Sequence, residues 1–222
     1  PSARLYEEIL KLFLNGHATE TFILLRKYNL FKYLFPQADQ LLHPTCHTLD
    51  KNQKNDSYEF IVRALNNTDQ RINTGDSATP GFLLAAMLWE PVRILSSEYI
   101  SNNLPEVEAA KLAGDAIISK QISSTSIPRR FTHMARDIWT LQARLKGTKK
   151  RAIRVLMHPR FRAAYDFLLL RAQSDERLEN LVDYWTKEQL NEPLVGKGKP
   201  RKSGNRRNSS YRRTSSSRKK DL

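Results

Sequence analysis

Residues 127–145 read IPRRFTHMARDIWTLQARL, and the apolar side chains in this stretch recur at intervals of three and four residues. Positions three and four apart lie on the same face of a helix, so these side chains form one apolar stripe. The stretch therefore predicts a long amphipathic helix whose buried face consists of Ile127, Phe131, Met134, Ile138, Leu141 and Leu145.

Helical spacing also dominates on both sides of this stretch. Thr79-Pro80 reads as an N-cap followed by proline at a first helical position, and Pro105 reads as a second helix start. Pro91 is expected to kink or end the helix that Pro80 opens, and residues 36–55 read as polar and irregular. No alternating polar and apolar run competes. The sequence predicts an all-α, irregular multi-helix body with helices near residues 5–13, 22–29, 56–72, 80–90, 105–117, 159–172 and 175–189.

Positive charge is concentrated in two segments of this 222-residue chain. Residues 128–163 hold 11 Lys and Arg against one acidic residue, Asp137, and residues 196–222 hold another 11 against Asp221. The two segments together carry +20 in a chain whose net charge is +14, so the remainder is mildly acidic. Such clusters usually bind a polyanion, and nucleic acid is the first candidate. A role in solubility alone would explain the second segment better than the first.

Two predicted helix starts and the loop between them supply the expected phosphate contacts of the body. Pro128 and Pro159 are each expected at a first helical position, followed by arginines in the first turn. Free N–H groups at a helix N-terminus bind phosphate, although the helix dipole disfavours cations there. The alternative is that these cations are solvated or paired with acids of neighbouring helices. The expected contacts are Arg129, Arg130, Lys146, Lys149, Lys150, Arg151, Arg160 and Arg162.

The C-terminal tail has a different composition from the body. Gly, Ser, Asn, Lys and Arg dominate after Pro193, and such a segment cannot bury enough apolar area to offset its ordering entropy. We therefore expect residues 196–222 to be disordered when free. Flexible arginine-rich segments follow single strands by counterion release, and Tyr211 offers a ring for a base. The expected contacts here are Arg206, Arg207, Arg212 and Arg213.

Motifs for catalysis and for metal binding are missing from the sequence. There is no P-loop, GxGxxG, HExxH or paired CxxC. Glu106 and Glu108 fall in a first helical turn, where the dipole favours acids, and His43, Cys46 and His47 lack a clear fourth zinc ligand. We expect neither a catalytic residue nor a metal site. The aromatic residues interleaved with the basic segment have the spacing of a core, which disfavours base stacking.

Cysteine content and hydropathy indicate the compartment. Cys46 is the single cysteine, and no stretch approaches 18 apolar residues. The sequence therefore favours a reducing, cytoplasmic environment and no membrane-spanning helix. The helical pattern begins directly after Pro1, which resembles the edge of a longer protein.

Several segments, read as strings, resemble the bacterial poly(A) polymerases, which belong to the class II nucleotidyltransferases. The similarity covers nearly the whole chain, including its arginine-rich end, and is most specific at HPRFRAAYDFLLLRA, residues 158–172. Other similar strings are ARLYEEILKLF (3–13), TFILLRKY (21–28), LFP (34–36), TPGFLLAAMLW (79–89) and IPRRF (127–131).

This resemblance implies a C-terminal part that starts after the catalytic head and after the base-selecting motif. It implies neck-type RNA-binding helices at residues 1–36, a helical body at 37–195 and the tail at 196–222. The complete protein would transfer AMP from ATP to RNA 3′ ends with Mg²⁺ and so promote RNA decay. The chain itself would bind single-stranded RNA 3′ ends without extending them. The implied partners are the catalytic head, a DEAD-box RNA helicase and RNA-decay factors.

Other interpretations remain open at the level of sequence. A CCA-adding tRNA nucleotidyltransferase shares the head, the neck and a helical body. From a different class, the chain could be a non-catalytic helical RNA-binding adaptor. A DNA-binding module is less favoured, because no helix-turn-helix or homeodomain signature is present.

Overall fold

The described chain is built from helices. The computed structural model describes residues 2–42, 56–147 and 152–191, and every regular element in these ranges is helical. The predicted all-α body is therefore confirmed, while the tail expected to be disordered lies outside these ranges. In chain order the elements are α1 (Ser2–Phe13), α2 (Ala18–Lys27), α3 (Phe31–Leu34), α4 (Pro36–Leu41), α5 (Asp56–Asn73), α6 (Pro80–Met87), α7 (Trp89–Ser101), α8 (Glu106–Ser124), α9 (Arg129–Leu145), α10 (Ala152–Leu156), α11 (Phe161–Ala172), the 3₁₀ helix η2 (Glu176–Leu178) and α12 (Glu179–Asn191).

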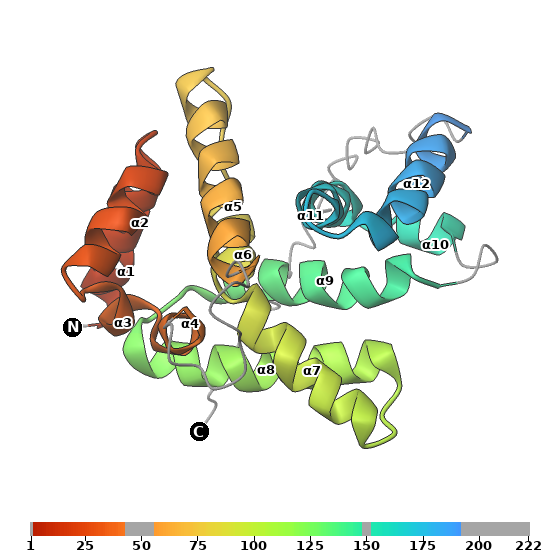
Figure 1. Cartoon of the computed structure of the whole chain (residues 1–222), viewed down its shortest axis with the longest axis horizontal. Coiled ribbons are helices and arrows are strands. Elements are labelled where there is room, and N and C mark those ends of the chain that lie inside the picture. Colours follow the sequence, from red (N-terminus) through yellow and green to blue (C-terminus); the bar gives the residue numbers. More distant parts are fainter. Residues whose placement is uncertain (1, 43–55, 148–151, 192–222) are drawn as a thin grey trace, which may run out of the picture.

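The helix predicted from residues 127–145 is α9, and it lies at the centre of the molecule. α6, α8 and α11 pack along it, while α1 to α4 form the left-hand edge in Figure 1 and α10 to α12 the right-hand side. The expected apolar stripe is the buried face of α9, with Met134, Ile138, Leu141 and Leu145 all buried. The amphipathic pattern thus determines which face of α9 packs against the neighbouring helices.

The prediction of irregular structure from residue 36 was wrong for α4. Pro36 opens this helix, because a proline lacks only an N–H that has no partner at a first helical position. Ala38 and Leu42 are buried in the core, so tertiary packing also supports this helix. The rest of the segment, residues 43–55, lies outside the described residues.

The proline-marked helix starts and the proline-marked helix end are both observed. Thr79 is the N-cap residue of α6 with Pro80 next, and Pro105 is the N-cap residue of α8. The helix that Pro80 opens ends just before Pro91, as expected. That helix ends before Leu88, at a break with φ −103° and ψ 9°, and Pro91 falls in the first turn of α7. Residue i−4 of Pro91 is Met87, the last residue of α6, so the break lies where proline removes a helical hydrogen bond.

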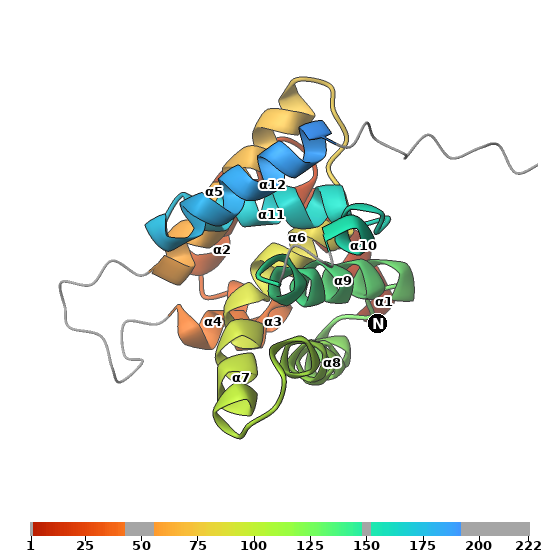
Figure 2. The ribbon, with the colours of Figure 1, turned by 90° about the vertical axis from the view of Figure 1, so that its right-hand side faces the viewer.

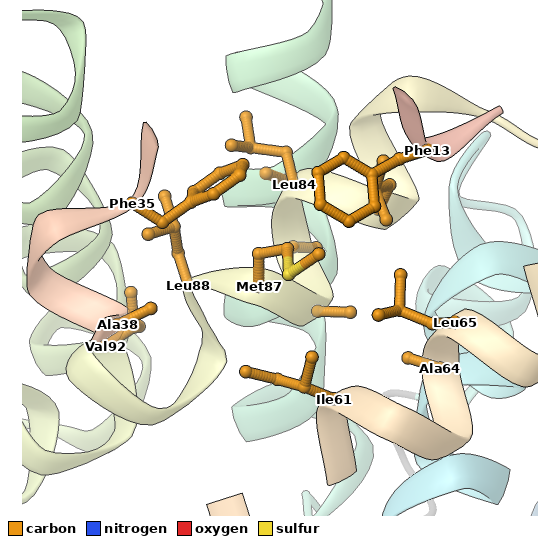
Figure 3. Close-up of a cluster of buried hydrophobic side chains, with 14 of the residues drawn as sticks. Phe13, Phe35, Ala38, Ile61, Ala64, Leu65, Leu84, Met87, Leu88 and Val92 are labelled. Carbon is orange, nitrogen blue, oxygen red and sulfur yellow. The ribbon is translucent and has the colours of Figure 1, made fainter. Parts of the chain in front are cut away.

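α6 lies inside the first hydrophobic core. Residues 83–88 are all buried, and Phe13 and Phe35 cover them from the N-terminal helices (Figure 3). Gly81 allows a close approach of α9, since a Cβ at this position would lie 2.8 Å from the Cβ of Met134. This core takes residues from both sides of residue 36, and the domain boundary at that residue stays a prediction.

A second, smaller core joins the end of α9 to α10, α11, η2 and α12. Trp185 of α12 is buried in it and donates a hydrogen bond from its indole Nε1 to the carbonyl oxygen of Leu145, 3.0 Å away. Figure 2 shows α12 lying along α11, in agreement with their contacts. The helices predicted near 159–172 and 175–189 are confirmed, with η2 as the first turn of the latter. The short helix α10 was not predicted.

Candidate nucleic-acid interface

Arg129 and Arg130 lie in the first turn of α9, as predicted. Pro128 is the N-cap residue rather than the first helical residue, and both arginines are exposed. The guanidinium of Arg130 lies 4.6 Å from the ring centroid of Phe131, which in turn packs against Tyr6. Arg130 is therefore partly held by this aromatic pair, whereas Arg129 forms no ion pair with another described residue.

The pKa of the Tyr6 hydroxyl depends on this environment. Burial raises the pKa of Tyr6 to about 12, and the positive charge of Arg130 opposes that increase. The start of α9 thus carries a cation beside a phenol whose burial favours the neutral form.

The second predicted helix start differs from the expectation. α11 begins at Phe161, so Arg160 is its N-cap residue and Pro159 lies outside the helix. The reason is a turn in which the backbone N–H of Arg160 donates to Nδ1 of His158 at 3.1 Å, and the N–H of Phe161 donates to the carbonyl of His158 at 2.8 Å. Arg162 lies in the first turn, as predicted. Its side chain is 74% exposed, and its Nε lies 3.1 Å from Oδ1 of Asp166.

Arg160 and Arg162 line a cavity of about 570 Å³. The second half of α5, the connection to α6 and the start of α11 surround it, and Arg71 of α5 supplies a third cation. Asp166 is the one carboxylate of the lining, so the lining groups carry a net charge of +2. Amide and hydroxyl groups complete the polar part: Asn67, Thr68, Gln70, Thr74, Ser77 and Thr79.

The chemistry of this cavity suits a single-stranded nucleic acid. Arginine donors match phosphate oxygens, and the amides and hydroxyls can bond to sugars or base edges. Phe82, Met134 and Leu169 are among its apolar lining residues. A volume of this size falls within the usual range of about 300–1,000 Å³ for small-ligand sites, which is enough for a nucleotide unit.

Lys146 lies far from Arg129, at the other end of the same helix. It follows the C-terminal end of α9, and the 17 residues of that helix separate it from Arg129 by about 25 Å. Its Nζ lies 2.5 Å from Oε1 of Glu106, so the alternative expectation of a cation paired with a neighbouring helix holds for this residue. The predicted contacts Arg129 and Lys146 therefore lie at opposite ends of α9, while Arg160 and Arg162 lie at the start of α11. Lys149, Lys150, Arg151, Arg206, Arg207, Arg212 and Arg213 lie outside the described residues.

The aromatic residues within the basic segment belong to the core, as their spacing predicts. Trp139, Phe161 and Tyr165 are buried, and Phe131 packs against the first core. Within the described ranges, no group of three His, Cys, Asp or Glu side chains could hold a metal ion. His43, Cys46 and His47 lie outside those ranges. None of the described helices has the length and apolarity that crossing a membrane requires.

Sequence reasoning missed two exposed tyrosines in the N-terminal helices. Tyr28 is 62% exposed and Tyr33 is 64% exposed. The Nζ of Lys27 lies 5.8 Å from the centroid of the first ring, and the Nζ of Lys32 lies 5.1 Å from that of the second. Exposed rings with adjacent cations are typical of surfaces that stack unpaired bases. The repeated Lys-Tyr pair, five residues apart around Asn29, is the signal that could have found them.

Comparison with known proteins assigns the family. Residues 102–220 match a family model described as "Polymerase A arginine-rich C-terminus". The chain belongs to the bacterial poly(A) polymerase I family. Residues 1–42 match a second model of this polymerase, described as "Probable RNA and SrmB-binding site of polymerase A". The two matches place the chain in the C-terminal part of a poly(A) polymerase, as the resemblance implied.

Poly(A) polymerase I proteins of several bacteria are similar to this chain. The one from Escherichia coli O157:H7 is 38% identical over 202 residues, which cover 89% of this chain and 42% of the relative. The Salmonella typhimurium protein is 37% identical over the same shares. The Haemophilus influenzae protein is 38% identical over 194 residues, 83% of this chain and 40% of the relative. The chain thus spans about two fifths of the length of the curated relatives it matches.

The family matches divide the candidate interface of this poly(A) polymerase region in two. Tyr28 and Tyr33 fall in the segment that matches the probable RNA- and SrmB-binding site. Arg160 and Arg162 fall in the segment that matches the arginine-rich C-terminus. Arg71, the third cation of the cavity, lies in neither match, so its place beside the other two comes from the tertiary structure alone.

Proposed function

We propose that this chain is the RNA-binding C-terminal region of a bacterial poly(A) polymerase. The complete protein would transfer AMP from ATP to the 3′ ends of single-stranded RNA with Mg²⁺ and so promote RNA decay. The catalytic head of that protein would carry the chemistry. The chain described here would hold the RNA and would not extend it by itself.

The cavity lined by Arg71, Arg160 and Arg162 is the observation that supports RNA binding most directly. Its cations come from two elements far apart in sequence, and they line one space of nucleotide size. Only Asp166 opposes their charge, so a bound phosphodiester would find a net positive environment. Arg129, exposed at the start of α9, is a further phosphate contact in this proposal.

Residues 1–42 would carry a second part of the function. Tyr28 and Tyr33 would stack unpaired bases, while Lys27 and Lys32 would contact the neighbouring phosphates. The same segment would bind a DEAD-box RNA helicase, because it matches the model named for SrmB binding. The arginine-rich tail would raise the local concentration of RNA. Contacts with RNA-decay factors and a cytoplasmic location remain predictions from the sequence.

RNA binding across a salt series tests the role of the folded body. Residues 1–222 and 1–195 would be titrated with a labelled single-stranded RNA oligonucleotide. If the body contacts four or five phosphates, the shorter chain still binds, with a log–log salt slope of roughly −3. Loss of all binding with the tail would contradict a binding site on the fold.

Substitution of the cavity arginines sharpens this test. Arg160→Gln together with Arg162→Gln should make the slope of the 1–195 chain shallower by about 1.4, because two phosphate contacts are lost. Lys111→Gln together with Lys120→Gln is the matched control, since both lysines are exposed on α8 away from the cavity. An equal change in both variants would show that only net charge matters. In the complete protein, incorporation of CTP in place of ATP would favour the CCA-adding alternative.

A further inference from the structure

A small pocket separate from the Arg160 cavity collects three cations. It lies between α7, α8, α9 and α11 and has a volume of about 90 Å³. Its lining includes Arg93 of α7, Lys146 at the end of α9 and Arg171 of α11. Glu106 is the one carboxylate of the lining, so these groups carry a net charge of +2. Glu90, which is not part of the lining, pairs with Arg93, and Glu106 pairs with Lys146, so Arg171 is the lining cation without an ion pair to a described residue.

Arg171 is the cation with the least compensation. Its side chain is half-buried, and no carboxylate of a described residue lies within ion-pair distance of it. The guanidinium lies 4.7 Å from the ring centroid of Trp89, and Nη1 donates a hydrogen bond to Oε1 of Gln142 at 3.0 Å. These two contacts orient the guanidinium without neutralising it. Burial lowers the pKa of Arg171 to about 10, and the positive charge of Arg93 adds to this effect. The negative charges of Asp175, Glu106 and Glu90 oppose it without forming an ion pair with Arg171.

Donors remain available at all three cations. A guanidinium has five N–H donors, and Gln142 uses one of those of Arg171. No nitrogen of Arg171 is among the buried side-chain atoms without a partner, so its other donors are accessible. Arg93 pairs with Glu90, and Lys146 pairs with Glu106 at 2.5 Å, but neither pair uses every donor. The pocket therefore presents hydrogen-bond donors from three helix regions to one small space.

We propose that this pocket binds a phosphate group. Arginine forks match the oxygens of a tetrahedral anion, and convergent cations from different elements give such an anion several charged donors at once. The volume is well below the roughly 300 Å³ of sites for small organic ligands, so the pocket takes an anion group and not a whole nucleotide. The phosphate is either free inorganic phosphate or a phosphodiester of bound RNA. This site goes beyond the proposed function and does not depend on it.

Thermal unfolding of the full chain in phosphate tests the site directly. The unfolding midpoint would be followed as inorganic phosphate increases, with sodium chloride at matched ionic strength as the reference, because a ligand of the folded state raises the midpoint by mass action. The wild-type midpoint should rise more in phosphate than in chloride. Arg171→Lys keeps the charge but loses the fork, so the apparent phosphate affinity should fall about tenfold. Lys120→Gln, on the exposed face of α8, should leave the response unchanged.

Glu106→Gln provides a test with the opposite sign. It removes the carboxylate that pairs with Lys146, so phosphate should bind about tenfold more tightly. A gain of binding cannot come from a misfolded variant, so this result decides the question even if Arg171→Lys fails to fold. Equal responses of the wild type and both pocket variants, or an equal rise in chloride, would overturn the proposal.

A competition experiment between inorganic phosphate and labelled RNA distinguishes the two sources of phosphate. If inorganic phosphate displaces labelled RNA and Arg171→Lys weakens both ligands, the pocket holds a backbone phosphate of RNA. If the variant loses phosphate binding while RNA affinity is unchanged, the site takes the free anion. The unfolding titration contains no RNA, so its failure would leave the proposed RNA-binding function standing.

Discussion

The carboxylate of Asp69 caps a helix that begins 51 residues earlier, accepting a hydrogen bond from the backbone N–H of Ala18 at 2.6 Å. Its second oxygen accepts from the N–H of Thr19 at 3.0 Å. The N-cap residue of α2, His17, makes no side-chain capping bond, so α5 supplies the acceptor that the local sequence lacks. This contact fixes α2, and with it the segment that carries Tyr28 and Tyr33, against the body.

Loss of this cap should destabilise the protein measurably. Asp69→Ala is expected to lower the free energy of unfolding by about 1–2 kcal/mol, because two N–H groups of α2 lose their acceptor. Urea unfolding followed by circular dichroism would measure it. Asp76→Ala removes an exposed acid in the connection after α5 and serves as the control. Similar stabilities of the two variants would show that the cap contributes nothing.

The close approach of α6 and α9 leads to a second prediction. Gly81→Ala would normally favour a helix, yet the new Cβ would lie 2.8 Å from the Cβ of Met134. We expect a net loss of about 1–3 kcal/mol from this overpacking. Met134→Gly removes the Cβ, Cγ and Sδ atoms that the new Cβ would meet, so the double variant should be more stable than the sum of the two single losses implies. Additive losses in urea unfolding would argue against the contact.

The exposed tyrosines predict a stacking contribution to RNA binding. Tyr28→Ala and Tyr33→Ala should each weaken the binding of a single-stranded RNA oligonucleotide by about tenfold, the usual effect of losing one base–aromatic stack. Tyr28→Phe and Tyr33→Phe keep the rings and should bind as the wild type does. If the alanine variants bind RNA normally, this exposed surface serves a protein partner instead.

The raised pKa of Tyr6 predicts a specific loss of stability at high pH. The folded-state pKa of about 12 exceeds the ordinary value of 10.0. The folded state therefore keeps the proton longer, and the stability from neutral Tyr6 is complete below pH 10 and lost as the pH rises toward 12. The Tyr6→Phe variant has no phenol to ionise at this position. Between about pH 9 and pH 11 its free energy of unfolding should therefore fall by about 1 kcal/mol less than that of the wild type. Urea unfolding at both pH values would measure this, and equal losses would contradict a buried phenol.

The sequence by itself determined the helical class and the central helix. Apolar residues at intervals of three and four specify which face of α9 is buried, and this information is local. Proline and threonine similarly predicted the starts of α6 and α8, because capping depends on neighbouring residues. Charge counts located the arginines of the candidate interface for the same reason, since charge is a property of composition.

Only the tertiary structure decided which of those residues meet. Arg71 joins Arg160 and Arg162 around one cavity, while Lys146, predicted as part of the same basic segment, lies at the far end of α9 beside Glu106. Asp69 caps α2 across 51 residues. Each of these outcomes depends on contacts between distant segments, which arise from burial and packing. Local patterns specify the elements, whereas the free energy of packing them together specifies their neighbours.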